Sequence, residues 1–507
     1  MTTLRPGKTG LFDADGIVVR GIMVRPITIR AVALLAVLGL CAGCSTVEVT
    51  GQASPAGELD PSMVAGLPVA QGPSGPKPGA TNANLNVRNT DNGDMDHLAE
   101  NALSDIFTYW SQQLPADFGK QFQPITTLIS FDSNGTDLKV CGGQDTNGVE
   151  NAFFCPVDDS VAWDRGTLLP VLDQMFGPMA VVTVFAHEMG HAVQYQLGSV
   201  TEKTPTIVKE QQADCYAGAF MRWVAAGSAP HFQLSTGNGL NQVLATMMFI
   251  RDQVGTTNTD EAAHGSAFDR VTAFQFGFAD GPLRCNRIDN NEIQQRITEL
   301  GFTTESQADD NVPVDAQTLQ LLSESLGASY KSSNAGKAPK FVTGDGTCQA
   351  GANTPPASYC TSSNTVNIDV DKLNVLATLP QNDQLGVGSA SLGDFAAFGE
   401  IASRYVLSVQ KAQKMPLTDP NAGLRTACLT GAWAGVARHR FADGPQQQLL
   451  LGPGDLDEAV AELLSPHSLI AADVNGKQVP SGFARVQAFQ IGFLQGSKDC
   501  LTEFSWN

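Results

Sequence analysis

Positive charge is scarce in this chain of 507 residues, which has 31 lysines and arginines against 51 aspartates and glutamates. The net charge of −20 argues against nucleic acid or an anionic lipid surface as a partner, because both attract lysine and arginine. Charged residues of either sign make up 16% of the chain, whereas there are 50 glycines and 27 prolines. This composition favours compact, loop-rich domains with a polar, uncharged surface, as in an exported protein, and the length allows about two to four of them.

An apolar run long enough to be a confident membrane span is missing near the N-terminus. Arg25 and Arg30 precede the short apolar stretch 31–40, whose length is typical of the core of a signal peptide. The stretch ends in Cys41-Ala-Gly-Cys44, which resembles a bacterial lipobox with cysteine where leucine is usual. We therefore expect a signal peptide over 1–44, lipidation of Cys44 and a lipoprotein on the outer face of the cytoplasmic membrane. A single uncleaved N-terminal anchor is the alternative, and it also exports the chain.

Residues 45–93 have too few apolar residues to form a core. Prolines and glycines recur among alanine, serine and other small residues. Such a composition is typical of a linker, so we expect a tether that holds the folded domains away from the membrane.

Histidine is also rare, with seven in the chain, yet two lie four residues apart in His187-Glu188-Met-Gly-His191. A chance H-E-x-x-H should occur in roughly one of two hundred such sequences. On a helix, positions i and i+4 share a face, so both imidazoles can bind one metal ion while Glu188 reaches a water on that ion. The pattern predicts metal-assisted peptide hydrolysis. A helix whose two histidines only complete polar interactions is the alternative.

A catalytic zinc ion needs a third protein ligand and leaves its fourth position to water. Glu210 follows His191 by nineteen residues, and Asp214 lies one helical turn later. We expect Glu210 to be the third ligand and Asp214 to accept the free N–H of a ligating imidazole, which fixes its tautomer. The Glu–Asp spacing by itself is weak, because helices carry such pairs on solvated faces.

These segments together resemble the bacterial neutral zinc metallopeptidase family. The resemblance rests on the H-E-x-G-H segment, on Glu210 through Gly218, on Cys141 through Pro156, and on His264-Gly-Ser leading to Arg270 and Phe278. It covers roughly residues 96–290 and implies a zinc-binding fold with His187, His191 and Glu210 as ligands. No particular substrate comes with the family.

Eight cysteines follow the lipobox, and an even number in an exported chain favours disulfides. An internal repeat narrows the pairing. Residues 268–285 align without gaps on 483–500 with ten identities in eighteen positions, and the four cysteines of each half occupy equivalent places. The first two cysteines of each half are close in sequence, so a disulfide between them closes a short loop, and the last two cysteines of each half then pair with each other. The expected disulfides are Cys141–Cys155, Cys215–Cys285, Cys348–Cys360 and Cys428–Cys500.

The repeat indicates a duplicated domain. We expect a zinc metallopeptidase domain over 94–335 and a degenerate second copy over 336–507. In the second copy, the positions of the three expected ligands hold Glu400, Arg404 and Gly423. No zinc site can be assembled from these residues, so the second copy is expected to be inactive.

The fold predicted for each copy is α+β and zincin-like, a small sheet packed on helices with the active cleft between them. Strands are expected within 124–131, 138–140 and 161–163, and helices over 94–114, 168–197 with a break near 177–178, 210–226 and 262–279.

Two further polar residues are candidates beside the metal. His264 begins the last of these helices and is expected to donate a hydrogen bond to the oxyanion of a tetrahedral intermediate. A helix-start histidine satisfied by backbone groups is an equally open interpretation. Tyr195, one turn after His191, could donate in the same way, although an aromatic residue at such a position is more often part of the core.

The favoured function is that of a Zn²⁺-dependent peptidase acting on peptide or protein substrates. Glu188 would take a proton from the metal-activated water and pass it to the leaving amine. The alternative is a non-catalytic envelope binding or scaffold lipoprotein with a structural or absent metal. The intact Glu188 favours the enzyme, because a structural site has no use for a general base.

Overall fold

The computed structural model describes residues 59–135, 138–254, 256, 263–296, 311–333, 337–380, 389–438, 449–452, 454–502 and 504. The predicted signal peptide and Cys44 lie outside these residues. Among the described residues, no helix is both long and apolar enough to cross a membrane. All of them belong to one unit, in which we distinguish an N-terminal half (59–296) and a C-terminal half (311–504).

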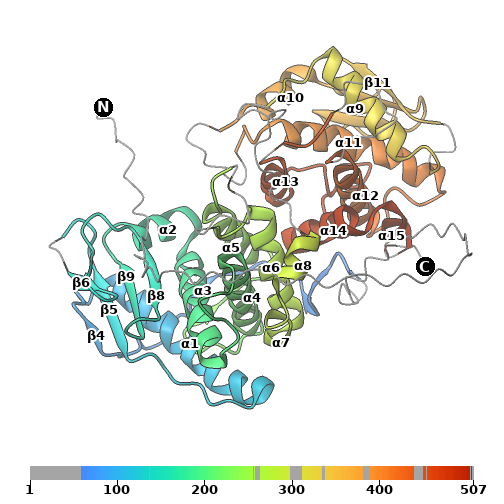
Figure 1. Ribbon diagram of the computed structural model, residues 1–507. Helices are drawn as coiled ribbons and strands as arrows, with labels where there is room; N and C mark the ends of the chain where they lie inside the picture. Colours follow the sequence, from blue (N-terminus) through green and yellow to red (C-terminus); the bar gives the residue numbers. More distant parts are fainter. Residues whose placement is uncertain are drawn as a thin grey trace, which may run out of the picture. The chain divides into compact units, whose positions relative to one another are not determined.

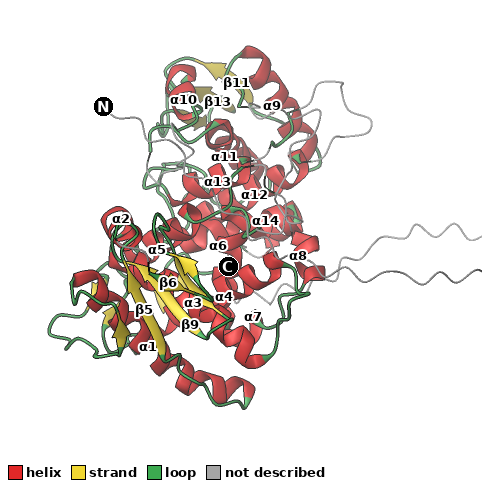
Figure 2. Ribbon diagram, turned by 60° about the vertical axis from the view of Figure 1, so that its left-hand side comes forward, coloured by secondary structure: helices red, strands yellow, loops and turns green. Residues whose placement is uncertain are grey.

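A four-stranded sheet in the order β4-β5-β9-β8 forms one layer of the N-terminal half (Figures 1 and 2). β5 is parallel to β4 and β9, and β8 lies antiparallel to β9 at the edge. Strands β5 and β9 are almost entirely buried, as expected for central strands covered on both faces. The strands are β4 Val87–Arg88, β5 Thr127–Phe131, β8 Ala152–Cys155 and β9 Ser160–Asp164, with a separate hairpin of β6 Lys139–Val140 and β7 Gln144–Asp145.

The helices of this half include α3 and α4, which pack on each other and carry the predicted site. They are α1 Asp94–Phe118, α2 Leu168–Phe176, α3 Pro178–Leu197, α4 Thr206–Ala225, α5 Asn238–Phe249, α6 Ala267–Asp280, α7 Pro282–Cys285 and α8 Asn290–Arg296. The predicted break separates α2 from α3, because Gly177 has a φ of 81° and Pro178 then begins the next helix. The mixed α+β class is confirmed.

The predicted linker over 45–93 is wrong for its described part, which is ordered against the N-terminal half. Its strands are β1 Met63–Val64, β2 Leu67–Pro68, β3 Gly75–Pro76 and β4. β3 pairs with β10 (Phe232–Gln233), β4 extends the sheet, and Val64 is 1% exposed. Composition predicted a tether because this segment forms no core of its own. It is instead ordered by hydrogen bonds to strands and loops distant in the sequence.

The described residues of the C-terminal half form one helix, three strands and then six further helices. In its sheet, β11 is parallel to β13 and β12 is antiparallel to it, which is the arrangement of β5, β9 and β8. The strands are β11 Lys340–Thr343, β12 Ala357–Cys360 and β13 Thr365–Ile368, and the helices are α9 Ala316–Ser329, α10 Val370–Leu376, α11 Asp394–Ala412, α12 Ala422–Ala437, α13 Asp455–Leu464, α14 Gly482–Gln495 and α15 Ser497–Thr502.

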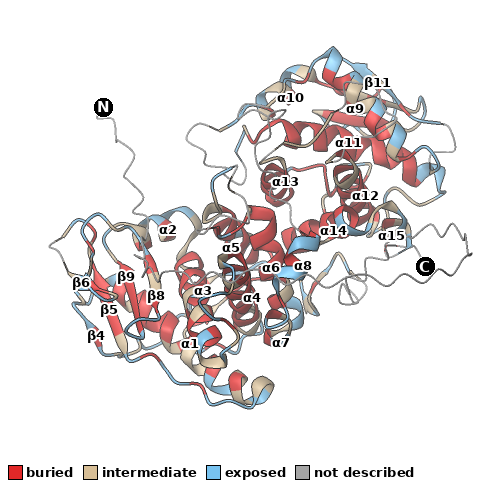
Figure 3. Ribbon diagram, viewed as in Figure 1, coloured by how far each residue is buried: buried red, intermediate tan, exposed pale blue. Residues whose placement is uncertain are grey.

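The two halves also share one close helix contact. A Cβ added at Gly218 of α4 would lie 2.0 Å from the carbonyl oxygen of Phe274 in α6, and a Cβ at Gly431 of α12 would lie 2.0 Å from that of Phe489 in α14. Figure 3 shows that all four helices are largely buried. Only glycine lets the two backbones approach so closely, so the sequence repeat reflects a repeated packing geometry.

The predicted boundary between residues 335 and 336 is wrong, because α9 packs on the C-terminal half. Trp433 Nε1 donates to Ser325 Oγ at 3.0 Å, and the Tyr330 hydroxyl donates to the Leu429 carbonyl. The C-terminal half therefore begins at or before residue 311. The sequence repeat did not extend to this helix, so it gave no reason to place the boundary earlier.

Four disulfides tie the elements together: Cys141–Cys155, Cys215–Cys285, Cys348–Cys360 and Cys428–Cys500. These are the pairs predicted from the repeat. In each half, one bridge closes a short loop at the sheet. The other bridge joins α4 to the short helix α7 in the N-terminal half, and α12 to the short helix α15 in the C-terminal half.

Candidate metal centre

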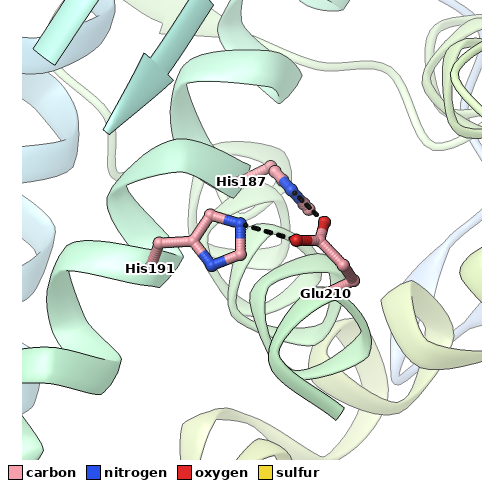
Figure 4. Close-up of side chains that lie close together, drawn as sticks. All are labelled: His187, His191 and Glu210. Carbon is pink, nitrogen blue, oxygen red and sulfur yellow. Dashed lines mark ion pairs between the residues drawn. The ribbon is translucent and has the colours of Figure 1, made fainter. Parts of the chain in front are cut away.

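Three side chains from α3 and α4 converge on one point (Figure 4). Nε2 of His187 lies 3.2 Å from Glu210 Oε2, and Nε2 of His191 lies 3.4 Å from Glu210 Oε1. Zinc bonds of about 2.0–2.1 Å at tetrahedral angles separate neighbouring ligand atoms by roughly 3.3 Å. The spacing of the three predicted ligands therefore suits one zinc ion.

The geometry depends on a close approach of the two helices. His187 and His191 share a face of α3, and their rings are perpendicular at 4.8 Å. Between them, Gly190 faces α4, where an added Cβ would lie 2.9 Å from Ala213 Cα. A larger residue at position 190 would push α4, and Glu210 with it, away from the histidines.

The charges of the site also fit a cation. Burial lowers the pKa of His187, but the carboxylates of Asp214 and Glu210 outweigh burial and raise it to about 10. Burial raises the pKa of Glu210, yet the two histidines hold it well below its usual value. Glu210 Oε2 is buried and, although it lies 3.2 Å from His187 Nε2, it accepts no hydrogen bond of ordinary geometry from the described residues. A positive charge between the three side chains is thus stabilised, and a metal ion would supply the missing partner of that oxygen.

Comparison with known proteins agrees with a zinc site in this half. Residues 43–288 match the family described as "Putative neutral zinc metallopeptidase". This part of the chain belongs to that family. The matched segment contains all three candidate ligands and Glu188, and it extends into the segment predicted to be a linker.

Uncharacterized bacterial proteins are similar to part of the chain. The chain is 28% identical over 151 residues to the uncharacterized protein Rv2575 of Mycobacterium tuberculosis, covering 25% of this chain and 52% of the relative. It is 30% identical over 200 residues to the uncharacterized protein YpfJ of Escherichia coli K12, covering 35% of this chain and 66% of the relative. The chain thus spans about half the length of the mycobacterial relative. No solved structure matches the chain.

A buried carboxylate orients the first zinc-ligand candidate. Asp214 Oδ1 accepts from His187 Nδ1 at 2.7 Å, so Nε2 is the ring nitrogen that faces Glu210 and is available to a metal ion. Asp214 is itself held by Arg270, whose Nε and Nη2 donate to its two oxygens at 3.0 and 2.8 Å. Arg270 on α6 was not predicted to have this role. Asp214 thus contacts His187, one of the two imidazoles that it was expected to orient.

The second histidine is oriented by a glutamine that sequence reasoning missed. His191 Nδ1 lies 3.1 Å from Gln194 Oε1, and the amide of Gln194 donates to the Lys209 carbonyl at 2.6 Å. Gln194 is fully buried. Its position three residues after His191, on the same helix face, was a signal that could have identified it.

Glu188 does not join the ligand cluster. It projects toward the edge of the sheet, where its Oε2 accepts from the backbone N–H of Phe154 in β8 at 2.9 Å. Tyr195 packs near Phe154 with ring centroids 5.9 Å apart and is 42% exposed, so it lies at the surface and not in the core. Strand β8 thus borders the site on the side of the expected general base.

His264 does not begin a helix as predicted, because α6 begins three residues later at Ala267. Its side chain is 47% exposed. Asp252 Oδ2 accepts from its backbone N–H at 2.6 Å, and Asp252 Oδ1 lies 3.2 Å from its Nδ1. This contact with Asp252 raises the pKa of His264, and the negative charge of Glu210 contributes. The imidazole is therefore within electrostatic reach of the ligand cluster, and Asp252 is its partner.

In the C-terminal half, the residues that the sequence repeat aligns with the ligands lie in packed surroundings. Arg404 is fully buried and donates to the carbonyl groups of Leu469, Ala472 and Asp473 at 2.8–3.0 Å. Gly423, which the sequence repeat aligns with Glu210, lies against the same segment, where an added Cβ would be 2.7 Å from the Ala471 carbonyl oxygen.

A second carboxylate group, of Asp394, Asp455 and Glu458, is also close enough to hold a cation. Each of these carboxylates accepts a backbone N–H: Asp394 from Val312, Glu458 from Phe395 at the start of α11, and Asp455 from Gly452 just before α13. Burial raises the pKa of Glu458 well above its usual value, and the neighbouring carboxylates add to this. The arrangement is that of helix-terminal hydrogen bonding.

Proposed function

We propose that this protein is a zinc-dependent peptidase whose ion is held by His187, His191 and Glu210. The observation that carries the proposal is the convergence of these side chains at tetrahedral spacing, with Glu188 beside them on the adjoining edge of α3. Structural zinc sites are closed by four protein ligands, whereas three ligands and an open position are typical of catalytic sites. A general base beside an open site supports hydrolysis.

When bound, zinc supplies a Lewis acid that polarises a carbonyl group and lowers the pKa of water. The residues of the chain perform the remaining steps. Glu188 accepts the proton of the attacking water and delivers it to the leaving amine. The N–H of Phe154 holds its Oε2, so Oε1 is the atom that takes the proton. His264, whose Nδ1 faces Asp252, would donate from its other ring nitrogen to the developing oxyanion.

The C-terminal half is proposed to be a degenerate copy of the zinc domain. Its sheet order, its disulfides and its glycine-mediated helix contact match those of the N-terminal half. Arg485 donates to the Ser465 carbonyl at 3.0 Å as Arg270 donates to the Ile250 carbonyl at 2.7 Å. Positions that serve packing are retained, whereas those of the ligands hold Glu400, Arg404 and Gly423.

Export and lipid attachment at Cys44 complete the proposal. They are supported by the apolar stretch 31–40, by the cysteine and small residues that follow it, and by the even number of cysteines in the remaining chain. The protein would then act on peptides or proteins at the outer face of the cytoplasmic membrane.

Metal analysis and peptide hydrolysis by the same purified preparations test the function. Wild type should hold close to one zinc per chain and cut members of a broad peptide library. His187→Ala and Glu210→Ala should each lose both zinc and activity. The matched control is His231→Ala, which removes a histidine that contacts Asp105 in the same half and should keep zinc.

Two outcomes would contradict the proposal. If Glu210→Ala keeps full zinc content, Glu210 is not the third ligand. If wild type binds zinc but cuts no peptide in the library, the protein is a non-catalytic binding or scaffold protein with a structural metal.

A further inference from the structure

The segment Ile250–Asp252, directly after α5, supports two groups at the zinc site. The carbonyl of Ile250 accepts from Arg270 Nη1 at 2.7 Å, and the same guanidinium holds Asp214. Two residues later, the Asp252 carboxylate holds His264 through its backbone N–H and lies near its Nδ1. A shift of this segment would therefore move both the Asp214–Arg270 pair, which supports His187, and His264, the candidate oxyanion donor.

The middle residue of this segment is held by the C-terminal half. Arg251 Nε donates to Asp457 Oδ2 of α13 at 2.9 Å, and both side chains are less than 10% exposed. Asp457 Oδ1 also accepts from the backbone N–H of Phe268, at the start of α6, at 3.4 Å. A buried, hydrogen-bonded ion pair fixes the relative position of its partners, because separating them leaves an uncompensated charge.

The interface around this ion pair is reciprocal. Phe268 of α6 packs on Phe493 of α14 with ring centroids 5.4 Å apart, and Phe278 of α6 packs on Phe483 of α14 at 5.2 Å. In the repeat, Phe268 is equivalent to Phe483 and Phe278 to Phe493. The two contacts are thus the same contact made in both directions, as in a symmetric dimer. Asp457 therefore lies at an interface whose packing holds its position.

We propose that Asp457 is a positioning residue for the zinc site, supplied by the C-terminal half. This proposal rests on the function proposed above. Asp457 contacts no zinc ligand and acts through Arg251. The residues on either side of Arg251 in the chain make the contacts with the site: the Ile250 carbonyl with Arg270, and the Asp252 carboxylate with His264. The C-terminal half, which has no zinc ligands, thus has a role: it fixes the segment Ile250–Asp252 that supports the zinc site of the N-terminal half.

The test compares Asp457→Ala and Asp457→Asn with wild type in the full-length protein. The measurements are zinc content, the rate of zinc transfer to a chelator, and kcat and KM for a peptide that wild type cuts. We expect about one zinc per chain in all three proteins. Asp457→Ala should release zinc about ten times faster, and its kcat should fall about ten-fold or more with KM nearly unchanged. Asp457→Asn should lie between the two, because its amide oxygen can still accept from Arg251.

A matched control is Asp419→Ala, which removes a buried partner of Arg425 entirely within the C-terminal half. It should lower the thermal midpoint and leave zinc release and kcat unchanged. The proposal is overturned if Asp457→Ala releases zinc and turns over substrate like wild type, or if Asp419→Ala shows the same losses. If wild type cuts no peptide, the peptidase function fails, and the zinc-release rates still decide the role of Asp457.

A double-mutant cycle identifies the route. Arg251→Ala should reproduce the effects of Asp457→Ala, and the double variant should lose little more than the larger single loss, since both changes remove the same contact. Fully additive losses would show that Asp457 does not act through Arg251.

Discussion

Replacing Asp214 by asparagine would test how the zinc ligands are held. Asp214 is fully buried, lies 2.7 Å from His187 Nδ1 and accepts two hydrogen bonds from Arg270. Asparagine has nearly the same shape, but it keeps one acceptor oxygen and gains an N–H donor. It therefore cannot satisfy both His187 and Arg270.

Two magnitudes follow from these contacts. Losing the partner of a ligating imidazole costs about 10–100-fold in metal affinity, or roughly 1.4–2.7 kcal/mol. Arg270, 2% exposed, also loses its counter-ion, and breaking one side of a buried pair costs about 3–5 kcal/mol of folding stability. Because asparagine retains one acceptor, we expect a loss near the lower end of this range.

The affinity is measured by competition with a chromophoric chelator, and the stability by thermal unfolding of the zinc-free protein. The control is Asp105→Asn, since Asp105 is an equally buried partner of His231, with 2.6 Å between Oδ1 and Nδ1. It should lose stability and keep zinc affinity. An Asp214→Asn protein that unfolds earlier but binds zinc as tightly as wild type would refute an orienting role for Asp214.

The remaining predictions concern the base, the second half and the metal. Glu188→Gln should keep one zinc and lose about two to four orders of magnitude in kcat, because glutamine cannot accept the proton; activity equal to wild type would place the hydrolysis at another site or in a contaminant. Residues 311–507 expressed alone should fold with two disulfides and bind no zinc. Crosslinks between the halves, found by non-reducing mass spectrometry of the full-length protein, would contradict this. Removing zinc should lower the thermal midpoint of the full chain, because free zinc at about 100 times its Kd stabilises the folded state by roughly 2.7 kcal/mol. The same chelator should leave residues 311–507 unchanged, and an equal shift would show that the effect does not come from the zinc site.

Much of the site could be predicted because its signals are local or repeated. His187 and His191 are four residues apart on one helix, so their shared face follows from helix geometry. The pairing of the cysteines followed from a repeat within the chain, because the four cysteines of one half align with the four of the other. The break between α2 and α3 followed from the conformations that Gly177 and Pro178 allow.

Long-range contacts escaped prediction. The segment 59–93 is ordered by strands distant in the sequence, such as β10, and no local pattern announces such a pairing. The hydrogen bond from Phe154 to Glu188 depends on how an edge strand meets a helix. Helix α9 lies N-terminal to the repeat that could be aligned, so its packing on α11 and α12 appeared only in the structure.

The sequence by itself determined which residue types stand at metal-binding spacing, and which half lacks them. Spacing on a single helix is set by covalent geometry and backbone hydrogen bonds, so it can be read without knowing the fold. The tertiary structure decided which groups orient those residues: Arg270 behind Asp214, Gln194 behind His191, and Asp457 behind Arg251. Each of these contacts brings together side chains whose distance depends on helix packing or rotamer choice, and many sequences with the same local patterns would pack differently.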